Sequence, residues 1–553
     1  MLPPSGLSTL PTTAPLPIDI RRFPWIRPLA ADYAFAYPQL AEFFAGNPAE
    51  ASEWTAAVAR ARQHPRARGP VADLIQAQQR ARGAPADALA ASALLRDAET
   101  VAVVTGQQAG LFGGPLFTLL KALTAIRLAE ELRARDKVAA VAVFWIDAED
   151  HDWNEVRQCG ILDSELAVRT VAAGDPPGAQ VSAVARVRLD ASIAQTLELL
   201  ATTLPRTEFT ADLLDGLRRA YQPGTGMADA FARWLEEVLG PRGLIVYDAS
   251  DPAAKPLVAN VFARELEHAG ETARLAARAG TALQERGYHA QVTPQDDTAA
   301  LFHLNAGREP IRRQGQDEFV IGERRLSREA LRALATQSPH EFSPNVLLRP
   351  IVQDTLFPTV CYVSGPSELA YLAQLKQVYA HFGLPMPLIA QRGTATIVDA
   401  NAMRFLTRHE LPLDALRAQD EGALNELLAG QLPPGVDASV ERVARMLEEQ
   451  MTEVANAVTA IDATLDGAAR SALGRMQDDL KKLHAKIIQA AKRKDDTLRR
   501  QFQHAQAQAF PGGHPQEREI GFVYFLNKYG PALIDRLGEL LPGERGTHYV
   551  LTI

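Results

Sequence analysis

The residues best equipped for chemistry form one short acidic stretch that contains a single histidine. Its polar members are Asp147, Glu149, Asp150, His151, Asp152 and Asn154. Crowded carboxyl groups raise one another's pKa, and a neighbouring carboxylate stabilises the protonated form of an imidazole. We therefore expect His151 to act in general acid–base catalysis, with Asp150 or Asp152 holding its tautomer and Asn154 binding substrate.

Two other interpretations of this stretch stay open. Histidine and carboxylate side chains bind Mg²⁺, Mn²⁺ or Zn²⁺. Residues 149–152 are consecutive, however, so they cannot all converge on one ion, and a second histidine at ligand spacing is missing. We therefore expect no metal ion held by the protein alone. Acidic residues also suit the N-terminus of a helix, where they complement the helix dipole.

The loop at residues 106–114 reads GQQAGLFGG and is a second candidate site. It lacks the lysine of the GxxxxGK[ST] phosphate motif, and its glycines do not have the GxGxxG spacing. A tight turn and close helix–sheet packing explain these glycines as well as a ligand does. Two adjacent amides, Gln107 and Gln108, can both donate and accept hydrogen bonds, which favours a polar ligand.

A third candidate site surrounds the apolar run at residues 359–363. Asn345 and Arg349 precede this run, and an arginine fork suits a carboxylate. The turn that follows, from Gly365 to Glu368, offers backbone N–H groups at the start of a helix, where anions bind. These four residues are therefore candidate substrate ligands.

The elements that must position these residues predict an α/β fold. Short apolar runs at 101–104, 138–146, 244–247, 359–363 and 388–390 predict buried strands, and residues 116–135 have helical spacing. Strand, loop, helix and strand make a βαβ unit, and open parallel sheets bind ligands beyond the carboxyl ends of their strands. One cleft is therefore expected to collect the candidate residues Gln107, Gln108, Asp150, His151, Asn154, Asn345, Arg349 and Glu368.

The rest of the chain is organised around this core. Residues 1–437 are expected to form the core, with N-terminal helices, a half-buried strand at 181–189, and an insertion at 288–342 with strands near 289–293, 301–304 and 318–321. Residues 438–506 have a heptad-like apolar seam interrupted near Gly467, which predicts an antiparallel coiled-coil hairpin. Its exposed apolar stripe predicts a homodimer. Residues 507–553 are expected to return to the core.

Composition excludes several classes of protein. Among 553 residues, 58 are Lys or Arg and 66 are Asp or Glu, so the net charge of −8 gives no general attraction to nucleic acid or to an anionic membrane. The N-terminus has no signal-peptide pattern, and no apolar run approaches the roughly 20 residues that span a bilayer. Only Cys159 and Cys361 occur, which rules out a disulfide framework. We expect a soluble cytoplasmic protein.

Several long blocks resemble the bacillithiol synthase family, from about Arg22 to the end of the chain. They read TGQQAGLFGGPLFTLLKA, FWIDAEDHDWNEV, SPNVLLRPIVQDTLFPTVCYVSGPSELAYLAQLK and REIGFVYFLNKYGPALIDRL. The resemblance implies a Rossmann-like core with connecting insertions and a projecting antiparallel coiled-coil arm used for dimerisation. It also implies a ligase that joins cysteine to the amine of glucosaminyl-malate, in the last step of bacillithiol biosynthesis.

The resemblance also suggests roles. His151 would take the proton from the sugar amine, Gln107 and Gln108 would bind the activated cysteine carboxyl or the sugar hydroxyls, and Arg349 would hold malate. Adenylate-forming synthetases share this kind of core, but the chain has no HIGH motif at the start of its helix and no KMSKS motif. The cofactor is left open, with ATP or another nucleotide as candidates. The alternative function is a nucleotidyltransferase-like or nucleotide-responsive scaffold with a partner-binding coiled coil.

Overall fold

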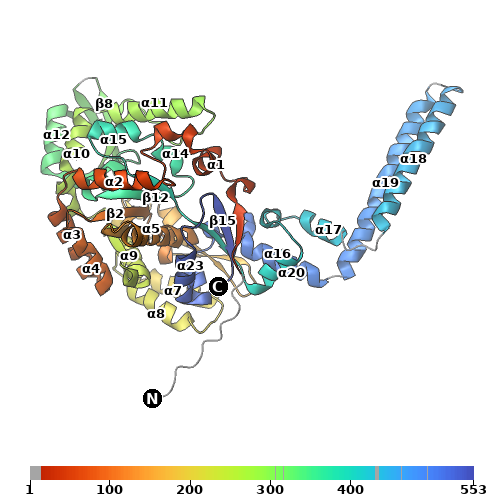
Figure 1. Cartoon of the computed structure of the whole chain (residues 1–553), viewed down its shortest axis with the longest axis horizontal. Helices are drawn as coiled ribbons and strands as arrows, with labels where there is room; N and C mark the ends of the chain where they lie inside the picture. Colours follow the sequence, from red (N-terminus) through yellow and green to blue (C-terminus); the bar gives the residue numbers. More distant parts are fainter. Residues whose placement is uncertain (1–13, 305–306, 316, 430–434, 463, 495) are drawn as a thin grey trace, which may run out of the picture. The chain divides into compact units, whose positions relative to one another are not determined.

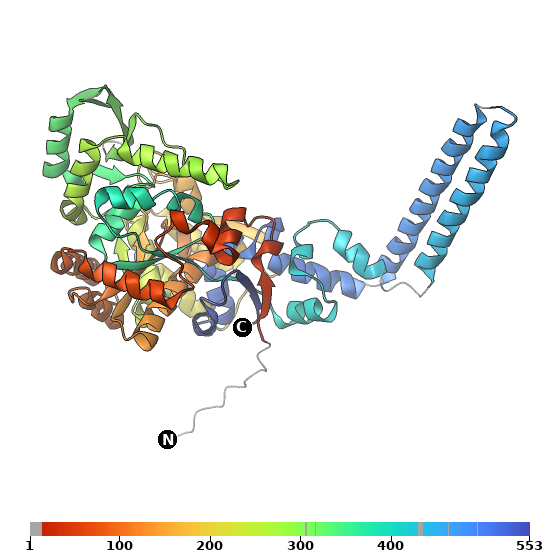
Figure 2. The same cartoon turned by 45° about the horizontal axis from the view of Figure 1, so that its top comes forward.

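The computed structural model describes residues 14–304, 307–315, 317–429, 435–462, 464–494 and 496–553. It divides into two compact units (Figures 1 and 2). One unit holds the described residues up to 396 together with 516–551, and the other holds those from 397 to 515. Across the described chain, no helix combines the length and apolar character needed to cross a membrane.

A five-stranded parallel sheet lies at the centre of the first unit. In spatial order its strands are β13 (Leu388–Gln391), β12 (Thr359–Ser364), β2 (Val101–Gln107), β3 (Ala140–Ile146) and β6 (Ile245–Asp248). Every apolar run that predicted a core strand lies in one of them, so the predicted α/β core is confirmed. The residues of β3 are all buried, which explains its continuous rather than alternating apolar sequence.

Helices precede and follow the βαβ unit β2–α5–β3 in the sequence. The long helix α5 (Leu116–Arg135) connects β2 to β3 and buries more than one of its faces. The other helices of this unit with eight or more residues are α1 (Pro28–Phe35), α2 (Ala51–Gln63), α3 (Arg68–Arg82), α4 (Ala86–Leu94), α7 (Ser192–Thr203), α8 (Thr210–Ala220), α9 (Met227–Leu239), α10 (Ala259–Glu267), α11 (Glu271–Glu285), α12 (Arg328–Gln337), α13 (Arg349–Leu356), α22 (Phe522–Tyr529) and α23 (Ala532–Leu540).

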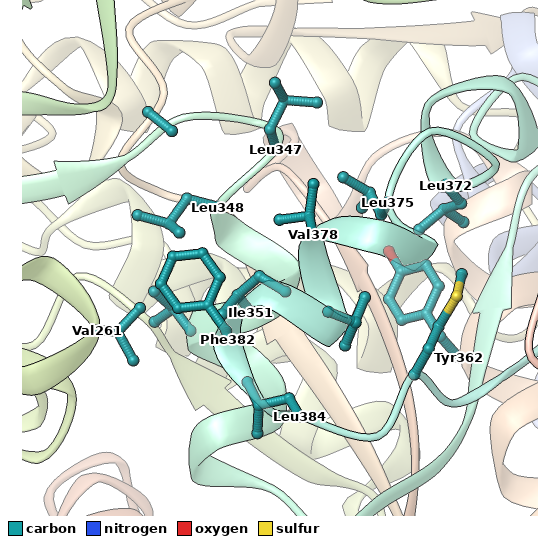
Figure 3. Close-up of a cluster of buried hydrophobic side chains, with 14 of the residues drawn as sticks. Val261, Leu347, Leu348, Ile351, Tyr362, Leu372, Leu375, Val378, Phe382 and Leu384 are labelled. Carbon is teal, nitrogen blue, oxygen red and sulfur yellow. The ribbon is translucent and has the colours of Figure 1, made fainter. Parts of the chain in front are cut away.

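A large apolar cluster packs α13 and the short helices α14 (Leu369–Leu372) and α15 (Lys376–Phe382) against the sheet. Figure 3 shows Ile351 of α13, Phe382 of α15 and Tyr362 of β12 among these side chains. Burial of each large apolar side chain contributes about 1.5–3 kcal/mol relative to exposure. This cluster therefore fixes α13, and with it Arg349 at the start of that helix.

The insertion contains an antiparallel sheet in the order β10-β9-β8-β7-β11. Its strands are β7 (Thr298–Leu304), β8 (Arg308–Gln314), β9 (Glu318–Ile321), β10 (Arg324–Ser327) and β11 (Phe342–Pro344). Two predicted strands here are confirmed, but the one predicted at 289–293 is wrong, because those residues have no regular structure.

The strand predicted at 181–189 is also wrong. This segment contains a single 3-10 turn, Val184–Arg186. Two of its backbone N–H groups donate hydrogen bonds to the backbone of the acidic stretch: Val184 N donates to Asp150 O and Ala185 N donates to Ala148 O, both at 2.8 Å. The segment packs against the loop after β3, and its only pairing among the described residues is an isolated antiparallel bridge between Arg188 and Gly226.

The C-terminal part of the chain returns to the core, as Figure 1 shows for β15 beside the N-terminal strand. β15 (Thr547–Leu551) lies between β1 (Leu16–Asp19) and β14 (Thr394–Ile397). Residues 516–522 lie against the glycine-rich loop, with Leu116 N donating to Ile520 O at 2.9 Å and Phe522 N to Gly114 O at 3.1 Å. A Cβ atom on Gly113, where φ is +97°, would overlap the Phe522 ring.

The second unit contains an antiparallel helical hairpin made by α18 (Val436–Thr459) and α19 (Leu465–Lys494), which lie side by side in Figures 1 and 2. The predicted coiled-coil hairpin is confirmed, although Gly467 lies inside α19 and the helices are joined before it. The other helices of eight or more residues in this unit are α16 (Ala400–Arg408), α17 (Gly422–Ala429) and α20 (Asp496–Ala509).

Candidate active site

A cavity of about 300 Å³ lies at the carboxyl edge of the parallel sheet, where β2, β3 and β12 end. We call it the first chamber. Five predicted site residues line it: Gln107, Gln108, Arg349, Gly365 and Glu368. Further lining side chains are Phe117, Lys121, Trp145, Asp147, Glu155, Tyr362, Tyr371, Arg392 and Arg518. The first chamber is therefore rich in cations, aromatic rings and carboxyl groups.

A buried ion pair between Lys121 and Glu368 organises the wall of the first chamber. Lys121 Nζ lies 2.5 Å from Glu368 Oε2 and also donates to Gly106 O at 2.9 Å and to Gln107 Oε1 at 3.2 Å. The Lys121 side chain is only 3% exposed. Burial alone would raise the pKa of Glu368, but the adjacent Lys121 ammonium and the N–H of Gly365 hold it below its usual value. Glu368 is therefore an anchored carboxylate.

This ion pair changes the interpretation of the turn at Gly365. Gly365 N donates to Glu368 Oε2 at 2.6 Å, so the N–H group expected to receive an external anion is already used inside the protein. Glu368 Oε1 accepts from Tyr362 OH at 3.1 Å and from Tyr371 OH at 3.4 Å. Gly365 and Glu368 thus shape the wall, and their carboxylate and backbone groups are mutually satisfied.

Arg349 is a buried cation with neutral hydrogen-bond partners. Its Nη1 donates to Gln353 Oε1 at 3.0 Å and its Nη2 to Tyr371 OH at 3.3 Å. Its guanidinium carbon lies 5.9 Å from the Trp145 ring centre and 5.6 Å from that of Tyr362. Within the described residues, no carboxylate oxygen lies within 4.0 Å of an Arg349 nitrogen. A buried arginine in this state is suited to a carboxylate ligand.

Two carboxyl groups of the wall have raised pKa values. Burial is the main cause that raises the pKa of Asp147, and the nearby carboxyl groups of Asp150 and Glu149 raise it further. The guanidinium groups of Arg349 and Arg308 partly offset this rise. Burial likewise raises the pKa of Glu155, with Asp152 and Asp150 adding to the effect. A raised pKa makes a carboxylate a stronger base. Glu155 is thus a candidate base that sequence reasoning did not single out.

The predicted catalytic residues lie beside the first chamber, outside its lining. Asp150 Oδ2 accepts from Gln108 Nε2 at 2.7 Å, and His151 Nδ1 is 3.3 Å from Asp150 Oδ1. The His151 side chain is 65% exposed. Asp152 caps the short helix α6 (Trp153–Val156) by accepting from Glu155 N at 3.0 Å. Its position agrees with the helix N-terminus interpretation.

The two predicted asparagine ligands also have other partners. Asn154 and Gln180 exchange hydrogen bonds through their amides at 3.1 and 3.3 Å. Asn345 Oδ1 accepts from Leu347 N at 2.9 Å and from Leu348 N at 3.1 Å, just before α13. The single cleft predicted for eight residues therefore needs correction: Gln107, Gln108, Arg349 and Glu368 line it, whereas Asp150, His151, Asn154 and Asn345 do not. Asp150, Asn154 and Asn345 are instead bound to Gln108, to Gln180 and to the backbone just before α13, respectively.

Sequence reasoning missed Lys121, Arg392 and Arg518 altogether. Lys121 had one available signal, since it is the only charged residue in the otherwise apolar start of α5. Arg392 and Arg518 had none, because they come from distant parts of the chain. In the described ranges, no three His, Cys, Asp or Glu side chains are arranged to hold a metal ion.

The Lys121–Glu368 pair yields a prediction for stability. Lys121→Met or Glu368→Gln should each lower the free energy of unfolding by about 3–5 kcal/mol, because each leaves one buried polar partner without its counterpart. The double variant should lose less than the sum of the two single losses. Urea unfolding of the wild type, both single variants and the double variant measures this coupling. Additive losses would contradict the pairing.

Two protein-family models match the chain. The model described as "Bacillithiol biosynthesis BshC, N-terminal Rossmann-like domain" matches residues 17–393, and the BshC C-terminal coiled-coil domain matches residues 395–553. Similar curated proteins carry the name "Putative cysteine ligase BshC". One from Salinibacter ruber is 33% identical over 531 residues, covering 95% of this chain and 96% of the relative. One from Chlorobaculum tepidum is 34% identical over 465 residues, covering 81% and 82%.

These matches extend over nearly the whole chain, and both matched domains correspond to folds that the structure contains. The Rossmann-like model covers the parallel sheet and every lining residue of the first chamber except Arg518. The coiled-coil model covers the helical hairpin and Arg518. The protein therefore belongs to the BshC family of bacillithiol biosynthesis, the family that its sequence blocks resemble.

Proposed function

We propose that this protein is a ligase that joins cysteine to the amine of glucosaminyl-malate and so forms bacillithiol. The names of its relatives support a cysteine ligase. The observation in the molecule that carries the proposal is Arg349, a buried guanidinium whose hydrogen-bond partners among the described residues are uncharged. A malate carboxylate would form a charge-assisted hydrogen bond with this guanidinium.

The remaining lining residues support roles in the same reaction. Gln107 and Gln108 bind the activated carboxyl of cysteine or the hydroxyl groups of the sugar, since their amides offer both donors and acceptors. A free carboxylate needs activation before an amine attacks it, and ATP or another nucleotide is our candidate for that step. We place the reaction in the cytoplasm, because both cysteines of the chain are free buried thiols, as is usual in a reducing compartment.

A first test concerns Arg349. Arg349→Met keeps much of the buried volume and removes the charge, so it should weaken glucosaminyl-malate binding about 10- to 100-fold through loss of a charge-assisted hydrogen bond. Isothermal titration calorimetry measures the affinity. Arg96→Gln, which removes an exposed arginine paired with Asp73, serves as the control. Equal affinity of the Arg349 variant and the wild type would refute the assigned role.

The proton acceptor is a separate question. His151 would remove the proton from the attacking amine, linked to the first chamber through Asp150 and Gln108. Glu155 competes with it for this role, because it lines the first chamber and its pKa is raised by burial. Glu155 would contact a substrate in the cavity directly, whereas His151 would act through Asp150, which contacts the lining residue Gln108.

Paired variants distinguish the two groups. Removing the true base should lower the rate of bacillithiol formation about 10²- to 10⁴-fold, so we compare His151→Ala with Glu155→Gln in a strain that lacks its own enzyme. A base must be deprotonated, so the wild-type rate should fall as pH falls through the base's pKa. If Glu155 is the base, Glu155→Gln abolishes this fall of the rate at low pH. Wild-type thiol levels with His151→Ala would remove His151 from the mechanism.

We further propose that the hairpin of α18 and α19 mediates a homodimer. Several apolar side chains on it are exposed, including Met446, Val454, Met476 and Leu483. Such an uncovered apolar stripe marks an interface, and a second copy of the same hairpin can cover it.

Light scattering tests the dimer. The double substitution Met446→Glu, Leu483→Glu should convert the dimer to a monomer, as should deletion of residues 438–506, because charged groups at a buried apolar interface are strongly unfavourable. Gln450→Glu, at an exposed polar position of the same hairpin, is the control for added charge. A dimer of unchanged mass in the double variant would contradict this arrangement.

A further inference from the structure

A second cavity of about 330 Å³ adjoins the first chamber. We call it the second chamber. The two chambers share five lining residues: Gln107, Gln108, Phe117, Glu155 and Arg518. Because the same side chains line both spaces, the two chambers meet at these residues.

The segment that carries Arg518 is held firmly at this junction. Arg392 donates to both carboxylate oxygens of the neighbouring Glu517, at 2.8 and 2.6 Å, and both side chains of this pair are buried. On the other side of Arg518, Gly521 N donates to Gly160 O at 2.9 Å. The backbone on both sides of Arg518 is thus fixed against the core.

Arg518 makes no direct ion pair within the described residues, although the Glu517 and Glu368 carboxylates are near enough to raise its pKa. Its guanidinium carbon lies 5.8 Å from the centre of the Phe117 ring, and that of Arg392 lies 5.6 Å from the same ring. In the described part of the chain, Arg518 forms no ion pair or side-chain hydrogen bond. Partial burial and the nearby Arg392 guanidinium lower the pKa of Arg518, and the Glu517 and Glu368 carboxylates act in the opposite direction. The Arg518 side chain is exposed and lines both chambers, so an anion bound at their junction can reach its guanidinium.

The two chambers differ in the chemistry of their walls. The first chamber has Arg349, whose hydrogen-bond partners are uncharged and which suits a carboxylate. The part of the second chamber that is not shared has Gln158, Thr170 and Glu519 among its lining residues. Amide, hydroxyl and carboxylate groups of this kind form hydrogen bonds with the hydroxyl groups of a sugar.

We propose that the acceptor substrate spans both chambers, with its dicarboxylate half in the first chamber and its sugar ring in the second. Arg518 binds a carboxylate of the acceptor at the junction and so selects an amino sugar that carries an acidic substituent. This inference rests on the proposed function and adds to it the second chamber and Arg518 as a specificity-determining residue. It also brings the sugar amine close to Glu155, which lines both chambers.

Calorimetric titrations of the full-length protein with malate and with glucosaminyl-malate test the proposal. Arg518→Gln should weaken binding of both ligands about 10- to 100-fold, because both carry the carboxylate. Thr170→Trp should obstruct the second chamber at an exposed position. It should weaken glucosaminyl-malate binding about tenfold or more and leave malate binding within about twofold of the wild type. Gln158→Trp, at another exposed position, is a second obstructing variant, and Arg96→Gln is the control for lost charge.

The outcomes separate this inference from the proposed function. Wild-type protein that binds neither ligand contradicts the proposed function, and the inference with it. Wild-type protein that binds both ligands, together with folded Thr170→Trp and Gln158→Trp variants of unchanged affinity for glucosaminyl-malate, overturns the second-chamber assignment alone. Weaker ATP binding by Arg518→Gln with unchanged malate binding would assign Arg518 to a phosphate and overturn its role as a carboxylate ligand.

Discussion

The buried ion pair of Lys121 and Glu368 is the interaction on which the architecture of the site depends. A lysine ammonium inside a protein is costly by several kcal/mol unless it is paired and hydrogen-bonded. Lys121 reaches that state only by contacting the end of β2 through Gly106 O and the turn after β12 through Glu368. The same contacts place Gln107 and, through the Tyr371 hydroxyl, Arg349 around one cavity.

The C-terminal segment completes this cavity and accounts for the glycines of the loop beside it. Gly114 O accepts a backbone hydrogen bond from this segment, and at Gly113 a side chain would collide with Phe522. The glycines therefore permit close approach between two pieces of chain about 400 residues apart in sequence. The amides of Gln107 and Gln108, which the loop presents to the cavity, are the part of the motif available to a ligand.

The acidic stretch after β3 divides its residues between two tasks. Asp147 and Glu155 face the first chamber, where burial raises their pKa. Glu149 instead forms a buried ion pair with Lys255, and Asp152 caps a helix. One acidic stretch of sequence thus supplies both carboxyl groups that line the cavity and carboxyl groups that stabilise the fold. Consecutive side chains on an extended or turning backbone cannot all face the same side, which explains this division.

The sequence by itself determined the parallel sheet, the coiled-coil hairpin and the family. Continuous apolar strands and heptad spacing are local patterns that burial imposes directly. It also indicated Gln107, Gln108 and Arg349, because sites of this fold lie at strand ends. Only the tertiary structure decided that Arg518 reaches the cavity, that Lys121 holds its wall, and that His151 and Asn345 lie outside its lining. Those outcomes depend on which of several distant side chains or backbone groups forms a hydrogen bond or ion pair with each polar atom. Local sequence does not show which of these groups will be the partner.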